Sequence, residues 1–155
     1  MRKDLENSYS HIEFLVRLLH KSDIEYVVTA ILIELGIPAK LEGSQFVKTA
    51  ILIYDKNSTG LVKARIYKGV AEAFDGVISV ETIEKAIRSA IKAGWEDREG
   101  KMWGYYFPGI DLRKKKPPSN HEFIAELSRV LELWVGIRQT YEYELEKKEV
   151  SYGIK

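Results

Sequence analysis

The sequence predicts an all-α fold of six to seven helices that contains a helix-turn-helix. Ser-x-x-Glu capping boxes, whose two side chains satisfy free N–H groups at a helix start, begin at Ser10, Ser22 and Ser119. Apolar residues recur at three- and four-residue spacing along most of the chain, as on the buried face of a helix. We find no convincing strand pair, and residues 51–54 are only a weak strand candidate.

Glycine and proline residues mark the ends of the first predicted helices of the core. We expect these helices over residues 22–35 and 44–54. Gly36 can form a left-handed cap after the first helix, and Pro38 prevents its continuation. The Asp-Lys-Asn-Ser-Thr-Gly stretch at 55–60 is typical of a turn after the second helix.

The helix-turn-helix is predicted over residues 61–94. Its first helix covers residues 61–74, and the Asp75-Gly76 pair ends it. Ser79 is a good N-cap for the second helix, because its hydroxyl can accept a hydrogen bond from the first turn. This second helix should run to Trp95.

The last third of the chain is predicted to be irregular first and then helical. Residues 95–118 hold three glycines and three prolines, so we expect no regular element there. The aromatic residues of this stretch either fill the core under a long loop or offer a stacking surface for bases or a partner. A last helix is predicted from Ser119 to about Glu149.

Composition limits the class of protein. The chain has 155 residues, no cysteine and a formal net charge of +1. Disulfides and cysteine-based zinc sites are therefore excluded, and affinity for nucleic acid would need cations gathered on one face. The N-terminus does not look like a signal peptide, and no apolar run approaches the ~20 residues of a membrane span. We expect a cytoplasmic protein without membrane contact.

The helix at 79–95 has the most informative side chains. Ile83, Ile87 and Ile91 fall on one side together with small residues, so this side can pack closely on neighbouring helices. The opposite side carries Lys85 and Arg88, which can donate to guanine, and Glu84 at its margin can accept from cytosine. This pattern favours insertion into a DNA major groove. A merely solvated outer face is the alternative.

Several separated motifs resemble one family in the same order along the chain. The stretch 83–91, Ile-Glu-Lys-Ala-Ile-Arg-Ser-Ala-Ile, is similar to the recognition helix of the C-terminal effector domain of the master (stage-zero) sporulation response regulator. Further similar segments are Ile33–Ala39, Gly43–Ile51, Ile66-Tyr67 with Val70-Ala71, Trp103–Tyr105, and Lys116-Pro117 with Ser119-Asn120 and Glu122–Ala125. The resemblance covers residues 24–133.

The resemblance implies an all-helical domain that binds a short box in double-stranded DNA, of TGTCGAA type, as a tandem or dimeric pair and regulates transcription. By matching positions, Glu84, Lys85 and Arg88 are the expected base contacts. Lys85 departs from the family arginine, so discrimination of guanine there should weaken or shift. Other expected contacts, to phosphate or elsewhere on DNA, are Thr82, Ser89, Lys92, Lys48, Arg113, Lys114, Lys115 and Lys116. For the run at 113–116, a solvated loop is the alternative.

The family joins this effector domain to a phosphorylatable receiver, and residues 1–23 are too short to hold one. We therefore expect one domain over 1–155 that acts without its own receiver, with a core at 24–133 and helical extensions at 1–23 and 134–155. The extensions either cover the core or form a homodimer seam. RNA polymerase is a possible partner, although the segment that helps contact it in the family is shortened here.

We expect no enzyme activity, no metal site and no cofactor, because no phosphate loop or catalytic set stands out. The main competing hypothesis is a protein-interaction module that modulates a full-length regulator or RNA polymerase. A third is a nucleoid-associated protein that binds DNA without sequence preference.

Overall fold

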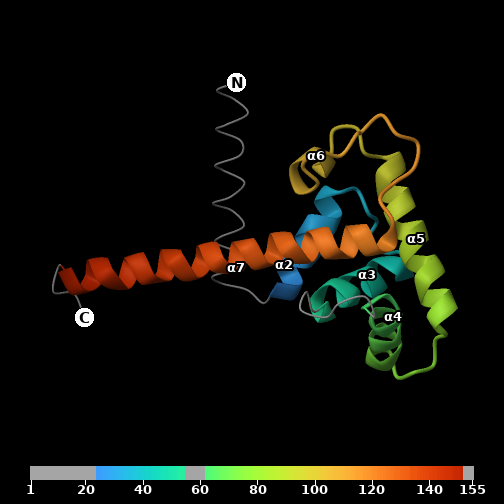
Figure 1. The fold of residues 1–155 in the computed structure, drawn as a ribbon, viewed down its shortest axis with the longest axis horizontal. Helices are drawn as coiled ribbons and strands as arrows, with labels where there is room; N and C mark the ends of the chain where they lie inside the picture. The colour runs from blue at the N-terminus through green and yellow to red at the C-terminus, as the bar shows by residue number, and fades with distance from the viewer. Residues whose placement is uncertain (1–23, 55–61, 152–155) are drawn as a thin grey trace. The chain divides into compact units, whose positions relative to one another are not determined.

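The computed structural model describes residues 24–54 and 62–151 of the chain, and every regular element in these ranges is a helix (Figure 1). The helices are α2 (Ile24–Glu34), α3 (Glu42–Ile53), α4 (Val62–Ala73), α5 (Val80–Glu96), α6 (Trp103–Tyr106) and α7 (Asn120–Ser151). The predicted all-α class is therefore confirmed. The capping boxes at Ser10 and Ser22 and the turn at 55–60 lie outside the described residues.

The chain divides into two compact units, residues 28–130 and residues 1–27 with 131–155. In the second unit, the described residues include the C-terminal part of α7, which continues as helix to Ser151. The first unit contains α3, α4 and α5, and therefore the whole predicted helix-turn-helix. Within the described ranges, no helix combines the length and apolar character needed to cross a membrane.

The core of unit 28–130 is formed by the apolar stripes of its helices. Its buried residues include Val28, Ile31 and Leu32 of α2, Phe46, Val47, Ala50 and Ile51 of α3, Ile66 and Val70 of α4, Ile83, Ile87, Ala90 and Ile91 of α5, and Phe123, Ile124 and Leu127 of α7. Burial at helical spacing on each element explains why these segments fold as helices, since most helical stability in proteins comes from such packing.

Helices α3 and α5 approach each other through small residues. A Cβ atom added at Gly43 of α3 would lie 2.6 Å from the carbonyl carbon of Ala86, closer still to its oxygen, and 3.0 Å from the Cβ of Ala90. Gly94, nearer the end of α5, likewise leaves room for the backbone carbonyl of Leu35 and the side chain of Ile37. The small-residue face expected for α5 is thus used for close helix packing.

The turn between α4 and α5 contains two successive residues with left-handed backbone conformation. Asp75 has φ +63° and Gly76 has φ +68°, and the Gly76 N–H donates to the Ala71 carbonyl oxygen at 2.8 Å. This bond caps the carbonyl end of α4. The Ser79 hydroxyl then accepts from the Thr82 N–H at 3.2 Å and caps the start of α5, as predicted.

The structure departs from the sequence prediction most clearly at α3 and in residues 95–118. Helix α3 begins at Glu42 rather than at residue 44. Its N-cap residue, Leu41, makes no side-chain hydrogen bond, so the sequence contains no capping residue that marks this start. Residues 95–118, expected to be irregular, contain the last two residues of α5 and the short helix α6. A single helical turn is too short to show periodicity.

Tertiary contacts hold α6 in place. The Trp103 indole N–H donates to the carbonyl oxygens of Leu35 at 2.9 Å and Gly94 at 3.2 Å. The Trp103 ring packs edge-on against Trp95, with 5.1 Å between centroids, and stacks on Phe107 at 5.3 Å. These three rings are buried. They therefore fill the core, and the stacking-surface alternative is wrong for them.

Candidate nucleic-acid interface

Helix α5 presents a polar face to solvent along its length. Lys85, Arg88, Ser89 and Lys92 are exposed, whereas the isoleucines of the opposite face are buried. Close packing on α3 leaves little freedom for the helix axis, because the contact is made by backbone and by small side chains. The outward side chains consequently project from a rigid support.

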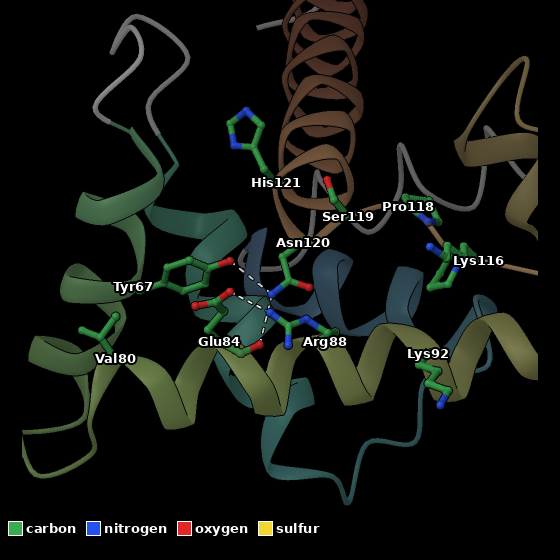
Figure 2. Close-up of a pocket in the computed structure, with 11 residues that line it drawn as sticks. Tyr67, Val80, Glu84, Arg88, Lys92, Lys116, Pro118, Ser119, Asn120 and His121 are labelled. Atoms are coloured by element: carbon green, nitrogen blue, oxygen red, sulfur yellow. Dashed lines mark hydrogen bonds and ion pairs between the residues drawn. The ribbon is translucent and has the colours of Figure 1, made fainter.

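A groove of about 630 Å³ runs beside this face (Figure 2). Its walls are α5, Tyr67 of α4, and the segment that leads into α7. The lining residues are Tyr67, Val80, Glu84, Arg88, Lys92, Lys116, Pro117, Pro118, Ser119, Asn120 and His121. Three cations, Arg88, Lys92 and Lys116, thus border one hollow together with a single carboxylate, Glu84.

The Arg88 guanidinium is held by Glu84 one turn earlier on α5. The two side chains form an ion pair of 2.7 Å between Arg88 Nη2 and Glu84 Oε1, and they are 60% and 42% exposed. An exposed pair at this spacing stabilises a helix by only about 0.3–0.5 kcal/mol. Arg88 can therefore exchange Glu84 for another acceptor at little cost.

Asn120 connects three helices at the floor of the groove. Its side-chain nitrogen donates to the Tyr67 hydroxyl oxygen of α4 and to the Glu84 carbonyl oxygen of α5, each at 3.1 Å. Asn120 is buried, and it is the first residue of α7. A tyrosine hydroxyl is protonated at neutral pH with its ordinary pKa of about 10, and burial raises the pKa of Tyr67 further.

The basic run Arg113–Lys116 is fixed through its backbone. The Trp95 indole N–H is shared between the carbonyl oxygens of Lys114 and Lys115, at 3.2 Å each. The Arg98 guanidinium donates to the carbonyl oxygens of Leu112 at 2.6 Å and Lys114 at 3.3 Å. These bonds attach the run to the C-terminal end of α5 while the lysine side chains remain exposed.

The structure brings some of the predicted site residues together and leaves others apart. Glu84, Arg88, Lys92 and Lys116 border the groove. Lys85 and Ser89 lie on the exposed face of α5, whereas the Thr82 hydroxyl bonds to that of Ser79 within the helix cap, at 2.8 Å. Lys48 lies on α3 and does not line the groove. Lys114 and Lys115 are exposed beside it, and Arg113 pairs with Asp111 at 3.1 Å, a contact that lowers the pKa of the Asp111 carboxyl.

Sequence reasoning assigned no role in the site to Tyr67, Asn120 or His121. Tyr67 and Asn120 belong to segments of the family resemblance, but neither has a charge or a spacing that indicates a site. They meet only because α4, α5 and α7 converge here. Within residues 24–54 and 62–151 there is no group of three or more potential metal ligands.

Comparison with known proteins identifies the family of this chain. Residues 28–131, more than half of the chain, match the family described as sporulation initiation factor Spo0A C terminal. No solved structure matches the chain. The family is a DNA-binding effector domain of transcription regulators and not an enzyme family. With an all-helical fold, a helix-turn-helix and a cationic groove beside the second helix, this chain belongs to the Spo0A C-terminal family.

Proposed function

We propose that this protein is a sequence-specific transcription regulator that binds double-stranded DNA through the outer face of α5, and that it acts in the cytoplasm. The observation that carries the proposal is the gathering of Arg88, Lys92 and Lys116 beside the exposed face of a rigidly packed α5. A chain of net charge +1 needs such local concentration of cations to attract a phosphate backbone.

Base recognition is assigned to Glu84, Lys85 and Arg88. Arg88 can leave its weak ion pair and donate two hydrogen bonds to guanine O6 and N7, while Glu84 can accept from cytosine N4. Lys85 projects from the exposed face as a single-point donor. The ion pair holds the two groups on adjacent turns of α5, which is compatible with contacts to neighbouring base pairs.

Backbone contacts are assigned to the cations around the groove. Lys92 and Lys116 border it, and Lys114 and Lys115 lie on a segment that Trp95 and Arg98 tie to α5. A segment held in this way can contact phosphate without first being ordered, so less entropy is lost on binding. Thr82, Ser89, Lys48 and Arg113 remain candidates for peripheral contacts.

The test compares a duplex carrying the TGTCGAA-type box with a scrambled duplex by fluorescence anisotropy at two salt concentrations. Arg88→Ala should weaken binding to the box by about 1–3 kcal/mol and weaken binding to the scrambled duplex clearly less, so that specificity is relaxed. Lys116→Ala should weaken both duplexes alike and lower the salt slope by about one. Arg129→Ala is the matched control, because Arg129 forms a similar ion pair with Glu126 on α7 and does not line the groove.

Equal losses on both duplexes with Arg88→Ala would contradict its assignment to base recognition. Wild-type protein that binds neither duplex would favour the protein-interaction hypothesis instead. Equal, salt-sensitive binding of both duplexes would indicate a DNA binder without sequence preference. The proposal includes a homodimer on a pair of boxes. Sedimentation of the protein with a duplex that carries one box, and with a duplex that carries two boxes, tests how many copies bind. RNA polymerase is a further proposed partner.

A further inference from the structure

We propose that Tyr67 contacts the DNA backbone, with its hydroxyl donating a hydrogen bond to a phosphate oxygen, and that Asn120 is the residue that positions this hydroxyl. The inference rests on the proposed function, because it assigns a further residue to the same DNA-binding groove. Tyr67 lies on α4, the first helix of the helix-turn-helix, and its ring points from α4 toward Asn120 (Figure 2).

The orientation of the Asn120 amide follows from its partners. The backbone carbonyl of Glu84 can only accept, so the amide nitrogen of Asn120 has to face it. The same nitrogen lies 3.1 Å from the Tyr67 oxygen. An amide nitrogen donates and does not accept, so the Tyr67 oxygen is the acceptor in this bond and its own proton is not used there.

The Tyr67 proton is therefore left for another acceptor. Among the residues that the structure describes, no hydrogen bond uses it, and Tyr67 lines the groove. Asn120 is only 8% exposed and is held at two points, so it keeps the tyrosine oxygen in one place. The result is a positioned O–H donor at the wall of a hollow bordered by Arg88, Lys92 and Lys116.

Phosphate is the acceptor that fits this surrounding. Three cations beside the groove attract an anion, and a tyrosine hydroxyl is a neutral donor at neutral pH because its ordinary pKa is about 10. In a helix-turn-helix, the second helix contacts base edges while the first helix crosses the backbone. Tyr67, as a residue of the first helix, is placed for a backbone contact.

Tyr67→Phe tests the proposal, since it removes one hydroxyl and keeps the ring. Anisotropy titrations should show about tenfold weaker binding to both the box and the scrambled duplex, as expected for one hydrogen bond to a charged group. The salt slope should stay unchanged, because a neutral donor releases no counterion. Lys116→Ala, in contrast, should lower the slope. Tyr105→Phe, a half-buried tyrosine outside the groove, is the matched control.

The role of Asn120 is tested by a double-mutant cycle. Asn120→Ala alone should weaken binding to both duplexes, and it should cost clearly less affinity when added to Tyr67→Phe than when made alone, because part of its effect passes through the hydroxyl. Additive losses would overturn the positioning role. Thermal melts of each variant set a titration temperature at which all are folded, so a fall in stability is not mistaken for a loss of contact.

Two results would overturn the Tyr67 assignment. Tyr67→Phe that binds both duplexes as tightly as wild type would show that no phosphate contact exists. A loss confined to the box would show a base contact rather than a backbone contact. Failure of the proposed function itself is recognised separately, since wild-type protein would then bind neither duplex before any variant is compared.

Discussion

Replacing Gly43 by alanine tests whether close packing between α3 and α5 sets the position of α5. The added Cβ would lie 2.6 Å from the carbonyl carbon of Ala86 and closer still to its oxygen, whereas real Cβ contacts essentially never fall below 3.0 Å. The obstacle is helix backbone and not the end of a flexible side chain. Relief therefore requires α3 and α5 to move apart.

The expected magnitude combines two opposing effects. Alanine is favoured over glycine inside a helix by about 1 kcal/mol. Overpacking of a core contact costs about 1–3 kcal/mol, and a backbone obstacle places Gly43→Ala at the upper end of that range. The net loss should be about 2 kcal/mol, which corresponds to a fall in Tm of roughly 4–8 °C for a chain of this size.

The assay is thermal unfolding followed by circular dichroism, with DNA anisotropy on the same samples. Gly136→Ala is the matched control, because Gly136 also lies in a helix and its added Cβ would meet no described atom within 4 Å. The control should be as stable as wild type or more so. Gly43→Ala should melt lower and bind DNA more weakly, since α5 is displaced. A Gly43→Ala protein as stable as Gly136→Ala would refute this account of the packing.

Two further predictions concern the start of α5 and a buried tyrosine. Ser79→Ala should lower the free energy of unfolding by about 1 kcal/mol in a urea titration, because it removes the cap on the Thr82 N–H. Ser79→Asp should keep most of this stability, since aspartate also caps helices. Equal stability of wild type and both variants would exclude the cap. The Tyr106 hydroxyl donates to the Glu34 carboxylate at 2.8 Å. In the folded state the pKa of Tyr106 is raised, mainly by burial and secondly by the Glu34 carboxylate. The unfolded chain loses this proton first, so stability should hold up to about pH 10 and fall as the pH rises further. Above about pH 10, the urea midpoint of Tyr106→Phe should fall less steeply with pH than that of the wild-type protein. The same fall with pH in both proteins would contradict the assignment.

The helices and the family could be predicted because their signals are local in sequence. The Ser79 cap, the isoleucine spacing of α5 and Gly36 after α2 each depend on residues within one or two turns of one another. Helix α6 could not be predicted, because four residues show no period and Trp103 is held by carbonyl oxygens of Leu35 and Gly94.

The candidate site was only partly accessible to sequence reasoning. A charged residue on the outer face of a predicted helix is recognisable from its position, and the resemblance singled out Glu84, Lys85 and Arg88. Neutral residues such as Tyr67 and Asn120 carry no such signal. Whether a predicted cation reaches the site also depends on tertiary placement: Lys116 borders the groove, whereas Lys48 does not line it.

By itself, then, the sequence determined the all-helical class, the helix-turn-helix and the polar face of α5, because helix periodicity and capping are encoded over short stretches of chain. Only the tertiary structure decided that Arg88, Lys116 and Tyr67 share one groove and that Asn120 ties α4, α5 and α7 together. These residues lie far apart along the chain. Their meeting depends on how closely helices pack, which is set at Gly43 by the absence of a side chain.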